Sequence, residues 1–256
     1  MKKLLVVSDT HSGHVVGLTP PAFNPRYDEP ALAALSKLRD KLYGWTMHEI
    51  HKIGKVDLTV FNGDGIEGKG ERSGSTELIE PDRNEQAKMC AHFLSSVNTR
   101  NMLMTYGTAS HTGVQEDVED VIANLVGCDI AATQDVEMNG KVFNFRHHVG
   151  SSTVPYGRAT QVKKERLWNQ LWAERGEYPK ADVIIRSHVH YFDYSGNADY
   201  LAMTTPALQG YGSKYGARRC SGTIDFGFVH FEISENGDIA WFPHILRMDY
   251  KPAQIF

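Results

Sequence analysis

Short apolar runs alternate with helix-like segments along the first half of the chain. Residues 3–8 hold a continuous apolar run that is typical of a buried strand, and similar runs cover 56–61 and 100–106. Between them, apolar residues recur every three or four positions over 29–52 and 84–98, which predicts two helices. This alternation of strand and helix predicts a layered α/β fold.

The second half of the chain is richer in strands. Helical patterns over 114–126 and 159–175 enclose two strand-like runs that Asn139-Gly140 joins, and Asn-Gly is the strongest short hairpin signal. A further apolar run covers 181–186, and residues 198–250 are typical of several strands. We therefore expect an α/β sandwich with a mixed sheet.

Length and composition fit one large domain. The chain has 256 residues, of which 41% are hydrophobic, and a net charge of −4, so we expect residues 1–256 to form a single domain with a full core. Three scattered cysteines argue against disulfides and against a cysteine zinc site. The first apolar run is too short for a signal peptide, and no apolar stretch approaches about 18 residues, so we expect a cytoplasmic protein without membrane segments.

Aspartates and histidines gather in five short segments, three of which follow predicted strands. In chain order these segments are Asp9-Thr10-His11, Gly63-Asp64, Gly107 to His111, His147-His148 and His188-Val189-His190. Side chains from separate strand ends can meet at the carboxyl edge of a sheet, where they can hold two divalent cations. Such cation pairs perform phosphoryl chemistry.

Each segment alone is a weak signal, and their order carries the argument. Asp64 between two glycines has the sequence of a simple turn, and Asp-x-His is a common tripeptide. The imidazoles of His188 and His190 suit borderline cations such as Zn, Mn, Fe or Ni. A mononuclear zinc site built on these two histidines would leave Asp9, His11 and Asp64 unexplained.

In this order the segments resemble those of the calcineurin-like metallophosphoesterases, which are four-layer α/β/β/α sandwiches with mixed β-sheets and a dinuclear metal centre. The resemblance implies ligands for two ions. The first metal would be held by Asp9, His11 and His190, the bridge would be Asp64, and the second metal would be held by His148 and His188. His148 is preferred to its neighbour because it stands two residues before Gly150, where the family often has Pro or Gly; His147 would then support the site or contact substrate.

The third segment departs from the family's pattern. Where the family usually has Gly-Asn-His, this chain has Gly-Thr-Ala-Ser-His at 107–111, which resembles phage- and prophage-type members. The asparagine ligand is missing. Thr108 or Ser110 could supply a weak oxygen ligand, or His111 could itself bind the second metal. The sequence therefore leaves open whether His111 is a ligand or the catalytic acid that the resemblance implies.

The resemblance implies a metal-dependent phosphoesterase with two divalent ions, manganese being favoured over iron, zinc and nickel. Catalysis would depend on Asp64 and His111, and Arg146 and Arg158 are candidate phosphate-binding residues because guanidinium matches phosphate geometry. We expect a phosphodiesterase acting on a nucleotide or on nucleic acid, including single strands.

Two alternatives remain open. A phosphomonoesterase of the same fold would use the same centre, and the low basic charge of the chain favours a small substrate. A non-catalytic protein that binds metal or a protein partner is kept open by the altered third segment, although a binding module has no need for a bridging Asp64.

Overall fold

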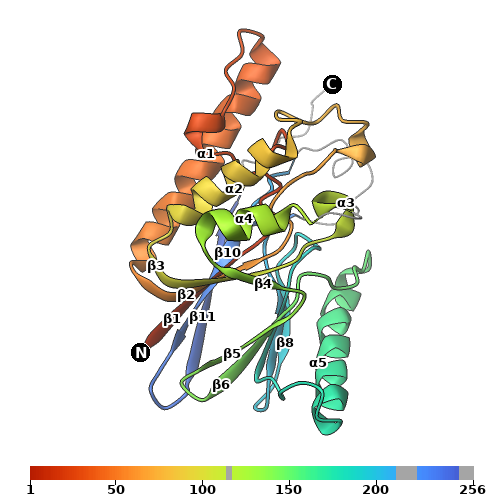
Figure 1. Cartoon of the computed structure of the whole chain (residues 1–256). Coiled ribbons are helices and arrows are strands. Elements are labelled where there is room, and N and C mark those ends of the chain that lie inside the picture. The colour runs from red at the N-terminus through yellow and green to blue at the C-terminus, as the bar shows by residue number, and fades with distance from the viewer. Residues whose placement is uncertain (114–116, 212–223, 248–256) are drawn as a thin grey trace, which may run out of the picture.

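Two β-sheets pack face to face, and helices cover their outer faces (Figure 1). The computed structural model describes residues 1–113, 117–211 and 224–247. The six-stranded sheet has the order β11-β10-β1-β2-β3-β4. Its strands are β1 (Lys2–Val7), β2 (Val56–Asn62), β3 (Thr99–Thr105), β4 (Asp129–Ala131), β10 (Phe226–Ile233) and β11 (Ile239–Leu246).

The five-stranded sheet has the order β5-β6-β7-β9-β8. Its strands are β5 (Gln134–Met138), β6 (Lys141–Phe145), β7 (Val183–Arg186), β8 (Asp193–Gly196) and β9 (Leu201–Thr204). Both sheets are mixed, because β1 to β4 run parallel beside the antiparallel pair β10 and β11, and β6, β7 and β9 run parallel beside the antiparallel β5 and β8.

Alternation along β1 explains how one apolar run serves two cores. Successive side chains of a strand point to opposite faces. Leu5 and Val7 pack into the cluster beneath the helices, whereas Leu4 and Val6 pack into the cluster between the two sheets. All four side chains are fully buried, which is why this strand is apolar throughout.

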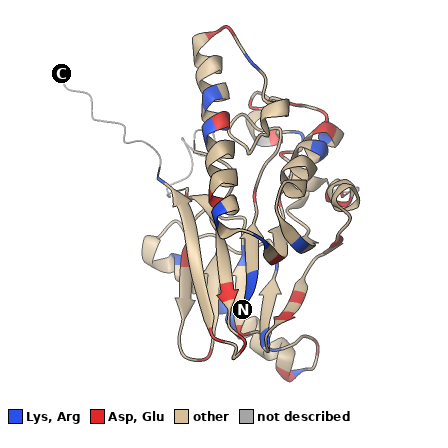
Figure 2. Cartoon of the chain, turned by 90° about the vertical axis from the view of Figure 1, so that its left-hand side faces the viewer, with Lys and Arg blue, Asp and Glu red and all other residues tan. Residues whose placement is uncertain are grey.

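Helices on both sides complete four layers. The helices α1 (Pro30–Ile53), α2 (Arg83–Ser95) and α4 (Glu119–Val126) cover the six-stranded sheet, and α5 (Arg158–Glu174) covers the five-stranded sheet (Figure 1). The outward side of α1 carries basic and acidic side chains in alternation (Figure 2). The predicted α/β/β/α sandwich with mixed sheets is confirmed. None of the helices within the described ranges is both long and apolar enough to span a bilayer.

Most predicted elements appear with shifted ends. The start of α1 is as its sequence suggests: the Glu29 carboxylate accepts a hydrogen bond from the Leu32 N–H (2.8 Å), and Pro30 occupies the first turn. The helix expected over 114–126 begins only at Glu119, and residues 114–116 lie outside the described part of the chain. A short helix, α3 (Ala109–Thr112), was not predicted.

The Asn139-Gly140 hairpin joins β5 to β6 as predicted. Both turn residues have positive φ, 50° and 76°, as a tight type I′ turn requires. The next strand end, β6, then leads directly into His147, and the parallel β7 leads into His188.

The carboxyl ends of four strands meet at one place. The N–H of Asp9, after β1, donates to the carbonyl of Gly63, after β2 (2.9 Å). The N–H of Ser187, after β7, donates to the carbonyl of His147, after β6 (2.8 Å). The His147 ring then reaches the carbonyl of Asn62 at the end of β2 (2.7 Å) and so joins the two sheets. The fold thus brings four of the five motif segments together.

Candidate metal centre

The motif residues form three overlapping groups of metal-ligating side chains. Within each group, the ligand atoms lie no more than 4.8 Å from one another. The groups are Asp9, His11 and His190; His11, Asp64 and His111; and Asp64, His147 and His188. Because Asp64 and His11 each belong to two groups, the three form one continuous cluster.

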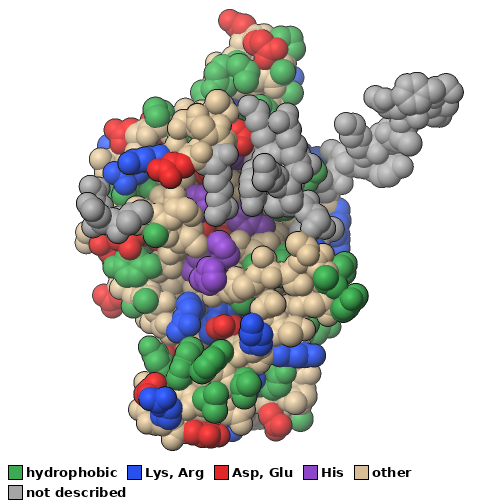
Figure 3. Space-filling view, turned by 90° about the vertical axis from the view of Figure 1, so that its right-hand side faces the viewer, with side chains coloured by type: hydrophobic (Ala, Val, Ile, Leu, Met, Phe, Trp, Pro, Cys, Tyr) green, Lys and Arg blue, Asp and Glu red, His purple; other side chains and the backbone are tan. Residues whose placement is uncertain are grey.

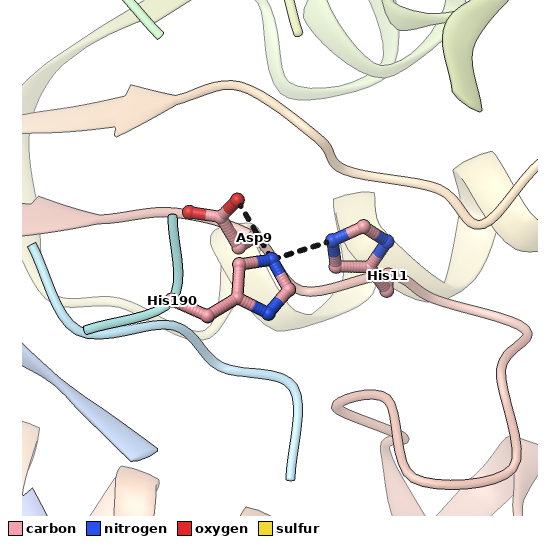
Figure 4. Close-up of side chains that lie close together, drawn as sticks. All are labelled: Asp9, His11 and His190. Atoms are coloured by element: carbon pink, nitrogen blue, oxygen red, sulfur yellow. Dashed lines mark hydrogen bonds and ion pairs between the residues drawn. The ribbon is translucent and has the colours of Figure 1, made fainter. Parts of the chain in front are cut away.

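Figure 4 shows the first group, in which two histidines and a carboxylate point toward one another. Nε2 of His190 lies 3.3 Å from Oδ1 of Asp9 and 3.2 Å from Nε2 of His11. The chain reaches this point from the ends of β1 and β7, which are far apart in sequence.

Backbone conformation sets the cluster apart from the rest of the described chain. Seven non-glycine residues there have positive φ, and five of them are candidate ligands. These five are Asp9 (52°), His11 (41°), Asp64 (55°), His188 (74°) and His190 (57°). Each such conformation costs about 1–3 kcal/mol and persists only where the surroundings impose it. Strain of this kind, collected in one side-chain cluster, is characteristic of functional sites.

Asp64 lies at the middle of the cluster and is held there as a carboxylate. Its Oδ1 accepts hydrogen bonds from the N–H of Thr108 (2.6 Å) and from its hydroxyl (3.0 Å), and its Oδ2 lies 3.0 Å from Nε2 of His147. Burial by itself would raise the pKa of Asp64, but attraction to His147 and the hydrogen bonds it receives hold that pKa well below its ordinary value. The position of Asp64 between two groups fits a shared ligand.

Glycines permit the chain to pack this closely. Gly63 has a φ of 81°, and a Cβ there would lie 2.6 Å from Nδ1 of His147. A Cβ on Gly107 would overlap Oδ1 and the backbone nitrogen of Asp64. The glycines of the second and third segments are therefore required by the close approach of their backbones to the cluster.

The two adjacent histidines differ in their surroundings. His147 is buried and belongs to the group with Asp64 and His188, whereas His148 is exposed and belongs to none of the three groups. Nδ1 of His147 donates to the carbonyl of Asn62, which leaves Nε2 directed at Asp64. In this structure His147 is therefore the one of the pair that lies in the cluster.

Electrostatics at His147 reflect the carboxylates around it. Burial lowers the pKa of His147, but attraction to Asp64 and Asp9 outweighs burial and raises that pKa to about 10. Attraction to His147 and to His190, whose Nε2 lies 3.3 Å from Oδ1 of Asp9, lowers the pKa of Asp9 to about 2 against the effect of its burial. The cluster therefore holds two carboxylate charges that a cation would neutralise.

Glu67 orients His11, and the sequence motifs did not single it out. Its Oε2 lies 2.9 Å from Nδ1 of His11, so Nε2 of His11 is the nitrogen that faces His190. Burial, followed by repulsion from His111 and His190, lowers the pKa of His11 well below its ordinary value, which keeps the imidazole neutral. Its position three residues after Asp64 was the available signal in the sequence.

His111 enters the cluster from α3. Its Nδ1 lies 3.0 Å from the carbonyl oxygen of Glu67, and its ring packs edge-on against His11 with centroids 4.5 Å apart. Of its neighbours in the third segment, Thr108 binds Asp64 directly, whereas Ser110 is exposed and only reaches the Thr108 hydroxyl (3.3 Å). The side chain that replaces the family's asparagine thus contacts the shared carboxylate.

Glu119 supports the cluster from α4 and also escaped the sequence analysis. It is fully buried, and its two oxygens accept hydrogen bonds from the N–H groups of Gly65 (2.8 Å) and Gly107 (2.6 Å). Burial, with repulsion from Asp64, raises the pKa of Glu119 to about 8. It ties the two loops on either side of Asp64 together, and no local spacing in the sequence marks this role.

The donor atoms fit a bound cation. Among the described residues, three buried ligand atoms make no hydrogen bond of good geometry: Oδ1 of Asp9, Nε2 of His147 and Nδ1 of His188. Nε2 of His190 lies 3.3 Å from the first and Oδ2 of Asp64 lies 3.0 Å from the second, so these ligand atoms approach one another without satisfying one another. A buried polar atom without a hydrogen bond costs about 1–3 kcal/mol, and cations bound in the two groups that hold these atoms would remove that cost. Imidazoles with carboxylates suit Zn, Mn, Fe or Ni. The clustered aspartates and histidines are therefore able to bind metal.

The two candidate phosphate-binding arginines lie outside the three groups. The guanidinium of Arg146 lies over the ring of Trp172 in α5 (5.1 Å). That of Arg158 lies over the ring of Tyr191 (4.3 Å), the residue after His190. Both are half-buried, and both stand next to segments that carry candidate ligands.

Comparison with known proteins gives structural similarities only. No protein-family model and no curated protein matches the sequence. Among solved structures, an archaeal phosphodiesterase covers 94% of this chain and 99% of its own, at 13% identity and a TM-score of 0.45. Vps29 from Chaetomium thermophilum covers 96% and 98%, at 14% and 0.47, and a predicted phosphoesterase from Streptococcus pneumoniae covers 95% and 98%, at 12% and 0.37. At these values, the function of this chain has to be argued from its own residues.

Proposed function

We propose that this protein is a phosphoesterase that depends on two divalent metal ions and prefers phosphodiesters. The observation that carries the proposal is the cluster itself: five candidate ligands share a strained, left-handed backbone, and three buried ligand atoms of the cluster make no hydrogen bond of good geometry in the described structure. Proteins maintain such strain where a ligand makes use of it. The proposal treats residues 1–256 as one domain.

The ligand set follows from the three groups. Asp9, His11 and His190 would hold one cation, and His147 and His188 would hold the other. Asp64 would be shared between them. The second set replaces the histidine that we chose from the sequence. Manganese remains our preferred ion, with iron, zinc and nickel compatible with the same donors.

The chemistry divides between the cations and the protein. When bound, two such cations activate water and offset the charge that develops on a phosphoryl group. The protein positions these groups. Glu67 sets the orientation of His11, and Thr108 and Glu119 hold the loops around Asp64. These contacts are present without substrate.

We assign proton transfer to His111. Its Nδ1 is held by the Glu67 carbonyl, so Nε2 is the nitrogen that faces His11 and Asp64. As the imidazolium, a histidine held in this way could give its Nε2 proton to the oxygen of the leaving group and remain as the neutral tautomer with its hydrogen on Nδ1. The competing role, as a ligand of the second cation, is the other outcome of the same experiment.

A diester is preferred over a monoester on grounds of charge. A monoester carries close to two negative charges at neutral pH, and a diester carries one. The guanidinium groups of the two candidate phosphate-binding arginines, Arg146 and Arg158, lie over aromatic rings, which favours the less charged substrate. The phosphomonoesterase and the non-catalytic metal-binding protein remain the alternatives.

The test is hydrolysis by chelated protein that is reloaded with Mn, Zn or Ni. Bis-p-nitrophenyl phosphate represents a diester and p-nitrophenyl phosphate a monoester. We expect metal-dependent cleavage of the diester and a loss of at least about 100-fold in Asp64→Asn, since even partners of a ligand are worth about 10–100-fold. Asp129→Asn, an exposed aspartate on β4, is the matched control.

Each outcome has a distinct meaning. Full activity in Asp64→Asn would refute a shared carboxylate. Cleavage of the monoester alone would replace the diesterase with a phosphomonoesterase. Bound metal without cleavage of either compound would favour the non-catalytic alternative. For His111→Ala, lower turnover at unchanged metal content supports the proton donor, and loss of one ion makes His111 a ligand.

A further inference from the structure

The outward side of α5 carries a row of aromatic rings. Trp168 and Trp172 stack with centroids 5.9 Å apart and planes 24° apart, and Tyr178 follows at 5.6 Å from Trp172. Trp168 is 50% exposed, and Leu171 beside it is 40% exposed. Tryptophan is usually largely buried in a soluble protein, so a stacked pair of which Trp168 is exposed and Trp172 is half-buried indicates a binding surface. We refer to Trp168, Trp172 and Tyr178 as the aromatic row.

Cationic side chains flank the aromatic row. The guanidinium of Arg146 lies 5.1 Å from the Trp172 ring centroid, which is cation–π distance. Lys163 and Lys164 are exposed on the turn of α5 that precedes Trp168. This local excess of positive charge stands against a chain whose net charge is −4.

Three acidic residues lie on α5 or just after it, Glu165, Glu174 and Glu177, and two of them pair with arginines. The carboxylate of Glu165 accepts a hydrogen bond from the fully buried Arg186 (2.8 Å), so it serves an internal ion pair. Glu177, after the helix, lies 2.7 Å from Arg175. The basic charge beside the aromatic row is therefore not cancelled by these two carboxylates.

Arg146 and Arg158 connect α5, which carries the aromatic row, to the candidate metal centre. Arg146 stands two residues before His148, whose exposed ring lies 4.8 Å from that of the candidate ligand His188. The first residue of α5 is Arg158, and its guanidinium lies over the ring of Tyr191, the residue after His190. In Figure 3, basic side chains lie between the histidines and the hydrophobic side chains on this face.

We propose that this face binds single-stranded nucleic acid and leads one of its phosphodiesters to the metal cluster. Bases stack on exposed aromatic rings regardless of sequence, and arginine and lysine neutralise the phosphates that connect them. In a duplex the base faces are covered by neighbouring bases, so a row of rings selects unpaired strands. The inference rests on the proposed function, because it names the substrate of that centre.

The surface is tested by binding, independently of cleavage. A fluorescently labelled oligothymidine of roughly 12 nucleotides, comparable to the site of a single-strand-binding module, is titrated with protein in EDTA, and anisotropy gives the Kd. We expect the double variant Trp168→Ala/Trp172→Ala to weaken binding by at least about tenfold, since one stacked base is worth that much. Phenylalanine at both positions should restore most of the affinity.

The matched control is Tyr194→Ala. Tyr194 is 51% exposed, like Trp168, but it packs against Trp241 of the other sheet, away from the aromatic row. The Tyr194→Ala variant should bind the oligonucleotide with the same Kd as the native protein. Circular dichroism checks that each variant is folded, and single variants replace the double variant if it is not.

Several outcomes would overturn the inference. Equal Kd values for native protein and double variant would do so, as would preference for a duplex of the same sequence. A native dimer that the double variant converts to monomer would make the face a contact between copies. If the native protein binds the strand but cleaves no diester, the proposed function fails while the surface stands.

Discussion

Replacing His147 by alanine, with His148→Ala as its matched control, tests the geometry of the cluster most directly. The two residues are adjacent and chemically identical, and they differ in burial and direction. His147 directs Nε2 to within 3.0 Å of the Asp64 carboxylate, while its Nδ1 donates to the Asn62 carbonyl. His148 is exposed and belongs to none of the groups. The two variants remove the same side chain, once at the proposed ligand and once at the residue beside it, so a difference between them reports on the position of the ring.

The expected magnitude follows from what each side chain contacts. Removing His147 takes one of three donors from its group, and because partners of ligands are already worth about 10–100-fold in metal affinity, the affinity for that ion should fall by at least about 100-fold. In the absence of metal, His147→Ala should lower the free energy of unfolding by about 2–4 kcal/mol, because the buried carbonyl of Asn62 loses its donor and a cavity replaces the ring. His148→Ala should change stability by about 0.5 kcal/mol or less.

The assay is metal content per chain after dialysis against a weak chelator, together with unfolding in urea. His147→Ala should retain one ion fewer than the native protein, and His148→Ala should retain the native number. The reverse result, with loss of an ion only in His148→Ala, would refute the assignment and restore the ligand chosen from the sequence. Equal loss in both variants would mean that neither histidine is specific to the second ion.

Two further predictions concern residues that support the fold around the cluster and away from it. Glu119→Ala should cost about 2–4 kcal/mol in urea unfolding because two buried N–H groups lose their acceptor. Glu119→Gln, whose side-chain oxygen can accept only one of the two hydrogen bonds, should lose about half as much; equal losses would show that the hydrogen bonds are not the cause. On β10, burial and the neighbouring His244 lower the pKa of His230 to about 4, so the stability it contributes is present above pH 6.5 and is lost as pH falls through 4. The loss should be about 1–2 kcal/mol after allowance for solvent screening, and His230→Phe should flatten the stability profile between pH 6.5 and 4; an unchanged slope would contradict the assignment.

Much of the fold was predictable because its signals are local. The apolar run of β1 serves two cores, and a run with both faces buried is legible without a structure. The start of α1 and the Asn139-Gly140 turn were predictable for the same reason, since capping and turn chemistry act over a few residues. The start of α4 and the short α3 were not, because they follow from contacts of their loops with the cluster.

The residue types of the candidate site were also predictable from the sequence, but the directions of their side chains were not. Asp9, His11, Asp64, His188 and His190 were chosen from motif order, and the structure brings all five together. Their shared left-handed backbone has no signature in sequence, because aspartate and histidine reach positive φ only where tertiary contacts compensate the strain.

Sequence alone determined the layered architecture, the kinds of ligand and their order at strand ends, because these depend on alternation and spacing along the chain. Tertiary structure decided that His147 and not His148 enters the cluster, that Glu67 and Glu119 support it, and that Arg146 lies over Trp172. Each of these is a contact between segments far apart in the chain. Which side of a strand faces inward depends on how the second sheet packs on the first, and no local pattern encodes that packing.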